Sequence, residues 1–257
     1  MSLFRSRPWR TLLFLGSAAG VATALHFARQ NPWWLLVPLG FSVAALGSFL
    51  LRVLARRRVR RMLVQGRAEE LLALWRETLS DLPHADTTVP LLQATALAAT
   101  GHTERARQAL THASRGGAWA RAREHRLLIE TMLDAFEGDR QASLRKADEL
   151  RNLPLPDASR ELCEKVALLR EAVAAVARAF AHEPESHDAL LLWEAARRNA
   201  LIHWPLRYAA AVVCIDGGRN AEARELLSGA PSWPEDSAFR SFHAELSAYA
   251  EERSGSS

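Results

Sequence analysis

Cysteine, glycine and proline are scarce in this chain of 257 residues. The two cysteines, Cys163 and Cys214, lie inside helical patterns and form no C-x-x-C motif, which excludes a disulfide framework, a zinc knuckle and thioredoxin chemistry. The 13 glycines and 11 prolines lie mainly between periodic segments. Valine, threonine and tyrosine form no alternating runs, so strands are not indicated. We therefore predict an all-α protein.

Acidic residues and lysine are absent from residues 1–61, which nevertheless contain ten arginines. The rest of the chain then holds 23 of the 33 basic residues and all 29 acidic ones, a net charge of −6. The overall charge of +4 and the pI of about 9.6 thus describe neither part. We predict no nucleic-acid partner, because the basic excess lies where membrane proteins place it.

Charge is also absent from residues 11–28 and 31–51. As helices these runs would rise roughly 27 and 32 Å, close to the roughly 30 Å of bilayer hydrocarbon. The few residues between them allow only a tight turn. We predict a transmembrane hairpin with spans at about 11–28 and 32–54, within an anchor of residues 1–61 that contacts the lipid bilayer. A signal peptide cleaved near Ala22-Thr23-Ala24 is the alternative for the first run.

The arginines predict the orientation of this hairpin. Three precede the first span, one lies in the turn and six follow the second span. The positive-inside rule therefore predicts a multi-pass protein of the bacterial inner (cytoplasmic) membrane with both termini in the cytoplasm. The six that follow the second span are predicted to set topology and to contact lipid head groups: Arg52, Arg56, Arg57, Arg58, Arg60 and Arg61.

Small residues recur at every fourth position of both runs. They are Gly16, Gly20 and Ala24 in the first run, and Gly40, Ala44 and Ser48 in the second. Such stripes let helix backbones approach closely in lipid. We predict that they pack the two spans together, with formation of a homo-oligomer through the hairpin as the alternative.

Turn signals recur beyond residue 61. Glycines mark turns at Gly66, Gly101, Gly138 and Gly218, and a glycine-free turn is expected near Pro184, which gives intervals of 35, 37, 46 and 34 residues. Alanine follows five positions after two of these glycines, as Ala106 and Ala223. This pattern resembles the tetratricopeptide repeat, a 34-residue helix pair with a glycine turn. The long interval, in which we expect a long helix over residues 157–181, departs from it. The helix-A tryptophan, glycine and tyrosine are also mostly missing.

The resemblance implies a TPR-like α-solenoid over residues 62–252. Amphipathic spacing predicts a capping helix at 235–252, and we expect a disordered tail at 253–257. A non-repetitive helical bundle is the alternative. The layout of two spans, a basic junction and a repeat domain is similar to HemY-type inner-membrane proteins, mostly through residues 60–113. That likeness concerns architecture and implies no role in haem metabolism.

No catalytic constellation is present in the sequence. His182 and His187 lie five residues apart with a proline between them, which does not match the H-E-x-x-H metal motif. Patterns for a nucleophile elbow, a dinucleotide fold or a P-loop do not occur. We predict that the protein is not an enzyme and that it uses no cofactor or metal.

The repeat register instead predicts an apolar concave face that binds a partner. Its candidate residues are Leu91, Thr95, Leu128, Met132, Tyr208 and Val212. The face lacks the Lys and Asn clamp for acidic peptide ends, so we expect an apolar helix or extended segment as ligand. The predicted function is that of an inner-membrane-anchored adaptor or scaffold that binds a partner protein at the cytoplasmic face. The alternative is an accessory subunit of a membrane transport or envelope-assembly complex, in which the hairpin makes the functional contact.

Overall fold

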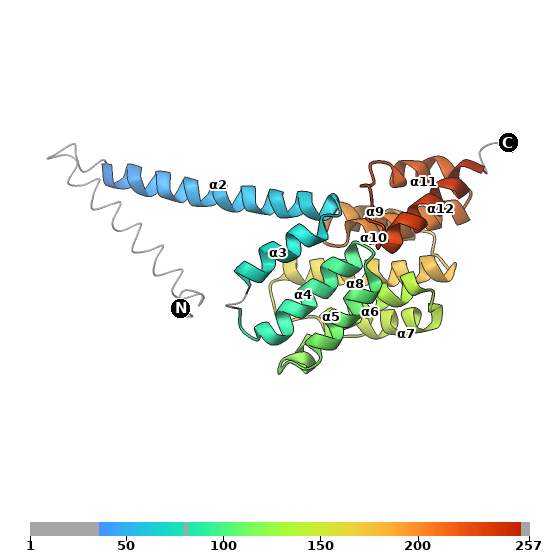
Figure 1. The fold of residues 1–257 in the computed structure, drawn as a ribbon, viewed down its shortest axis with the longest axis horizontal. Coiled ribbons are helices and arrows are strands. Elements are labelled where there is room, and N and C mark those ends of the chain that lie inside the picture. The colour runs from blue at the N-terminus through green and yellow to red at the C-terminus, as the bar shows by residue number, and fades with distance from the viewer. Residues whose placement is uncertain (1–35, 80–81, 253–257) are drawn as a thin grey trace. The chain divides into compact units, whose positions relative to one another are not determined.

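The computed structural model describes residues 36–79 and 82–252 (Figure 1). Every regular element within these residues is a helix and none is a strand, which confirms the all-α prediction. The chain divides into two compact units, Met1–Arg58 and Val59–Ser257. Each unit is described separately below.

The first unit contains most of helix α2 (Leu36–Val64). Six of its large apolar side chains are exposed: Val43, Leu46, Phe49, Leu50, Leu51 and Leu54. Within residues 36–79 and 82–252, no helix has both the length and the apolar character needed to cross a membrane. The first predicted span and its residues Gly16, Gly20 and Ala24 lie outside the described residues, and the second begins outside them.

Residues of α2 that were predicted to act in the membrane are partly described. Gly40, Ala44, Arg52 and Arg56 lie within the helix. Ser48 is exposed, and its hydroxyl donates a hydrogen bond to the carbonyl of Ala45 at 2.8 Å. The side chains of Arg57, Arg58, Arg60 and Arg61 are exposed as well.

The second unit is a series of helix pairs. After the last turns of α2 come α3 (Ala68–Thr78), α4 (Ala85–Ala99), α5 (Thr103–Ala113), the 3₁₀ turn η3 (Trp119–Ala122), α6 (Arg123–Glu137), α7 (Arg140–Arg151), α8 (Arg160–Ala181), α9 (Asp188–Arg198), α10 (His203–Asp216), α11 (Asn220–Leu227) and α12 (Ala238–Glu252). Neighbours α4 and α5, α6 and α7, α8 and α9, and α10 and α11 pack against each other.

The helix pairs turn at residues with a left-handed backbone. These residues are Gly66, Gly101, Gly138, His182 and Gly218. After each one, the next backbone N–H bonds the carbonyl five residues before it; for example, His102 N–H donates to Leu97 O at 2.9 Å. This Schellman arrangement satisfies carbonyls that a helix end leaves unpaired. The four predicted glycine turns are present, and the fourth turn lies at His182 rather than at Pro184.

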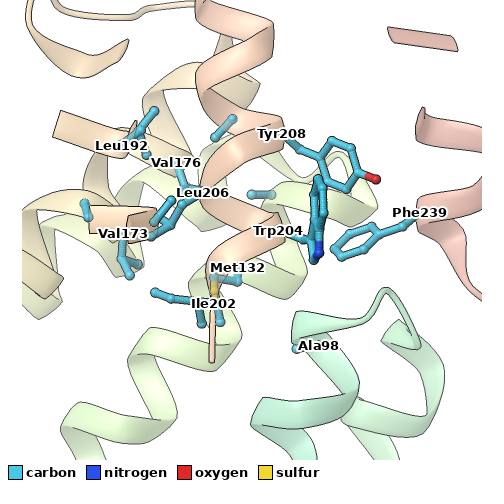
Figure 2. Packing of buried hydrophobic residues seen from close by; sticks show 14 of the residues in the cluster. Ala98, Met132, Val173, Val176, Leu192, Ile202, Trp204, Leu206, Tyr208 and Phe239 are labelled. Atoms are coloured by element: carbon cyan, nitrogen blue, oxygen red, sulfur yellow. The ribbon is translucent and has the colours of Figure 1, made fainter. Parts of the chain in front are cut away.

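Helix α10 lies at the centre of the core. Of its 14 residues, 11 are buried, and it contacts α4, α8, α9, α11 and α12. Figure 2 shows Ile202, just before α10, beside Met132, while Leu206 points toward Val173 and Val176 of α8. Helix α10 and the residue before it therefore fill the space beside α4, α6 and α8, which are the first helices of the earlier pairs.

The end of the second unit closes against its beginning. Ala238 N–H donates to Gly101 O at 2.9 Å, and the Ser237 hydroxyl donates to Thr100 O at 2.7 Å. Phe239 is fully buried and lies 5.1 Å from the ring of Tyr208 (Figure 2). Helix α12 therefore covers the core, while Tyr249 on its outer side is 57% exposed.

Candidate functional site

The six residues predicted to form a partner-binding face are buried in the core. Their exposed fractions are 8% or less for Leu91, Thr95, Leu128, Met132, Tyr208 and Val212. The predicted concave face is therefore not an open surface in this structure. The physical reason is that α10 packs against α4 and α8 and that α12 packs against α10, so a ligand would have to displace part of the core.

Hydrogen bonds also hold two of these residues in the core. The Thr95 hydroxyl donates to Leu91 O at 2.8 Å, so it accepts from Nε2 of His125 at 2.7 Å. The Tyr208 hydroxyl accepts a hydrogen bond from Nε1 of Trp233 at 2.6 Å, and burial raises the pKa of Tyr208. These polar groups already have partners, so they are not available to a ligand.

An uncovered apolar surface occurs instead on α8. This helix has 22 residues, whereas its partner α9 has 11. Most of residues 160–169 are exposed or half-buried, while the second half of α8 is buried. Two ion pairs at i,i+4, Arg160 with Glu164 at 2.8 Å and Lys165 with Glu161 at 2.6 Å, support helical backbone in this half.

A hollow of about 760 Å³ lies between the first half of α8 and the end of α9. Leu162, Val166 and Leu169 line it at i, i+4 and i+7, a spacing that places them on one face of the helix. Leu162 is 47% exposed. The remaining lining residues are Glu161, Glu164, Lys165, Leu168, Ala195, Arg198 and Asn199. We call this surface the α8 groove.

Arg170 fixes the base of this exposed half of α8. Its side chain is 5% exposed and donates hydrogen bonds to Glu124 of α6 at 2.8 Å and to Pro154 O at 3.1 Å. These hydrogen bonds hold the helix that carries the α8 groove against α6 and the α7–α8 connection.

The described residues contain one group of side chains close enough to share a metal ion, Glu185, His187 and Asp188. Asp188 is fully buried and accepts hydrogen bonds from Arg178 at 2.6 and 2.9 Å. Glu185 lies 3.5 Å from the same guanidinium. These carboxylates therefore belong to an ion-pair network around Arg178.

The environment of Cys214 does not favour a reactive thiol. Cys214 is buried, and burial raises the pKa of its thiol, which disfavours the nucleophilic thiolate.

Comparison of the chain with protein-family models, curated proteins and solved structures gives no match. The α8 groove, an apolar hollow of about 760 Å³, is the candidate functional site.

One buried and three half-buried histidines predict a loss of stability in mild acid. Burial lowers the pKa of His102, His125, His203 and His243 below the ordinary value of 6.5. A depressed histidine pKa contributes stability that is fully present above about pH 6.5 and is lost as the pH falls toward the folded-state value.

We therefore expect the thermal midpoint, followed by circular dichroism, to be level between about pH 7 and 8 and to fall progressively below about pH 6.5. Replacement of His125 by glutamine keeps a donor for Thr95 and should reduce this slope. A midpoint that stays level down to about pH 5 would contradict the prediction.

Proposed function

We propose that this protein is a membrane-anchored helical-repeat scaffold that binds another protein in the α8 groove. The observation that carries the proposal is the apolar stripe of Leu162, which is exposed, and Val166 and Leu169, which are half-buried, in a unit whose other large apolar side chains are mostly buried. Exposed apolar surfaces with polar rims are typical of protein-binding sites.

The shape of the groove favours a helical ligand. Asp188 at the start of α9 lies beside Arg178 near the end of α8, so the two helices run antiparallel from the His182 turn. Because α9 ends at Arg198, the first half of α8 extends beyond it. A helix from a partner would occupy the place that a longer α9 would fill, with its apolar residues at i, i+3 and i+4 against the stripe.

Two features support a TPR-like α-solenoid for the second unit. Helix pairs recur, and the left-handed turns at Gly66, Gly101, Gly138, His182 and Gly218 lie 35, 37, 44 and 36 residues apart. Three of these four intervals are within three residues of the 34 of the tetratricopeptide unit, and the third is ten residues longer. Repeats of this kind act widely as protein-binding surfaces.

The anchor in the proposal is the hairpin with spans at about 11–28 and 32–54. Its support is the absence of charge from residues 11–28 and 31–51 and the arginine excess outside them. The exposed apolar side chains of α2, such as Val43, Leu46 and Phe49, suit contact with lipid. The inner membrane with cytoplasmic termini remains our expected location.

Site-specific photo-crosslinking of the full chain in cells tests the scaffold proposal. A photoreactive residue in place of Leu162 should give a discrete cross-linked protein, while one in place of the exposed Tyr249 should not. Val166→Asp should reduce the Leu162 product by about tenfold or more, because a buried charge has no partner in an apolar contact. Equal products at both positions would refute a specific groove.

A variant with an exchanged anchor distinguishes the groove-binding scaffold from the alternative function, an accessory subunit that acts through its hairpin. Residues 1–55 are exchanged for an unrelated two-span anchor, and the Leu162 cross-link is measured again. A retained product supports binding through the groove. A lost product supports an accessory subunit whose own hairpin contacts the membrane complex.

A further inference from the structure

The outward face of α9 combines apolar and basic side chains. Leu190 is 62% exposed and Trp193 is 41% exposed, although Ala189 and Leu192 between and beside them are buried in the core. Arg197 follows at i+7 from Leu190, and its guanidinium stacks 4.6 Å from the centre of the Trp193 ring. This helix therefore presents an aromatic ring and a cation together on its outward face.

Arg60 adds a second cation from a segment far away in the sequence. Its guanidinium donates a hydrogen bond to Arg197 O at 3.5 Å. Residues 59–64 belong to the second unit, where Nε1 of Trp204 donates to Val64 O at 2.7 Å and holds the end of α2 in place. We call the set of Leu190, Trp193, Arg60, Arg197 and Arg198 the α9 basic face.

Few acidic groups neutralise this face. Glu194 lies 3.5 Å from Arg198 and offsets one of the three arginines. On the α11 side, Leu190 and Trp193 border a hollow of about 320 Å³, whose rim contains Arg219, Glu222 and Glu225. The excess of positive charge therefore lies toward the C-terminal end of α9. This local positive charge contrasts with the negative net charge of the second unit, in which residues 59–257 hold 25 basic and 29 acidic residues.

We propose that the α9 basic face binds the surface of an anionic lipid bilayer. The guanidinium groups of Arg60, Arg197 and Arg198 would bind head-group phosphates, for which their planar donor geometry is suited. Trp193 and Leu190 would enter the interfacial layer, where indole rings are favoured. Both the charge and the apolar content of the face complement this ligand. The α8 groove, which shares Arg198 with it, has equal numbers of acidic and basic lining residues.

This inference deepens the proposed function, because it places the folded helical unit against the membrane to which the hairpin would anchor it. The scaffold would then hold its ligand close to the bilayer. The contact itself requires only the second unit and an anionic surface, so it can succeed or fail independently of the hairpin.

The experiment uses the full chain with Cys163 and Cys214 replaced by alanine and with an environment-sensitive fluorophore on Leu190→Cys. The chain is added to vesicles of neutral phosphatidylcholine, or of the same lipid with phosphatidylglycerol at roughly a third of the total. Flotation measures whether the chain binds the vesicles. The fluorophore emission measures whether the α9 basic face contacts lipid. Circular dichroism confirms that each variant is folded.

We expect a blue shift of the emission with the anionic vesicles and none with the neutral ones. Arg197→Gln combined with Arg198→Gln should reduce the ratio of docked to undocked protein by about 30-fold, since each basic residue near an anionic surface contributes roughly fivefold. Lysine at both positions should retain most of the docking. Glutamine at the exposed Arg121 and Arg145 changes the net charge equally and should leave the ratio unaltered.

The outcomes separate this inference from the anchor. Flotation with both vesicles and an unchanged emission would overturn the inference and leave the anchor standing. Flotation with the anionic vesicles only, accompanied by the blue shift, would support the inference and refute the anchor. A blue shift of equal size with both vesicles, or no flotation with either, would overturn the inference.

Discussion

Replacement of Gly101 by alanine is expected to lower the free energy of unfolding by about 2–5 kcal/mol. One part of the cost is conformational, because Gly101 has φ of +79° and a side chain in this region costs about 1–2 kcal/mol. The other part is steric. A Cβ atom at this position would lie 2.8 Å from the backbone nitrogen of Phe239 and 2.6 Å from the Ser237 hydroxyl, so the closing segment would have to move.

Gly218 and Gly138 provide matched controls for this change. Both have positive φ, but a methyl group added at either residue would meet no atom of another segment within 4 Å. Alanine there should cost only the conformational part, about 1–2 kcal/mol. Urea unfolding of the three variants, followed by circular dichroism, measures the difference. An equal loss at Gly101 and Gly218 would show that contact with the C-terminal segment adds nothing to stability.

Four of the turns within helix pairs could be predicted from the sequence because a glycine marks each of them. A positive φ at Gly66, Gly101, Gly138 and Gly218 strongly favours glycine, so the residue type marks the turn. The same backbone conformation occurs at His182 with φ of 60°, where the residue type carries little information. Pro184 was the nearest helix breaker in the sequence, but the left-handed residue lies two positions earlier and α8 ends at Ala181.

The location of the binding surface could not be predicted in the same way. Apolar periodicity placed Leu91, Leu128 and Tyr208 on a concave face for a partner, whereas the structure buries them within α4, α6 and α10. Periodicity does not show what covers a face. The contact between α4 and α10 joins segments about a hundred residues apart, and no local pattern near Leu91 or Tyr208 encodes it.

The α8 groove was missed for a related reason. A long helix over residues 157–181 was expected, and α8 spans Arg160–Ala181. The stripe of Leu162, Val166 and Leu169 has the spacing of an ordinary core stripe. Its exposure follows from the shorter length of α9, since 11 residues can cover only about half of a 22-residue helix. A comparison of the two predicted helix lengths is the signal that could have found it.

Replacement of Asp188 by alanine is expected to lower the free energy of unfolding by about 3–5 kcal/mol. Asp188 is fully buried and pairs with Arg178, which is 11% exposed. Burial alone would raise the pKa of Asp188, but hydrogen bonds from Arg178 and from the backbone N–H of Glu185 outweigh it and hold the pKa below its usual range. Loss of this carboxylate leaves a buried guanidinium with only the longer contacts to Glu171 and Glu185, both 3.5 Å.

Two controls distinguish an unpaired buried charge from a general effect of losing an ion pair. Glu164→Ala breaks the exposed pair with Arg160 and should cost less than about 1 kcal/mol, because solvent screens both charges. Arg178→Met combined with Asp188→Asn removes both charges and keeps an acceptor for Glu185 N–H, so it should be less destabilising than Asp188→Ala alone. Chemical denaturation of the full chain measures all three. If the double variant proved as unstable as the single one, the cost would come from packing around the His182 turn and not from the unpaired guanidinium.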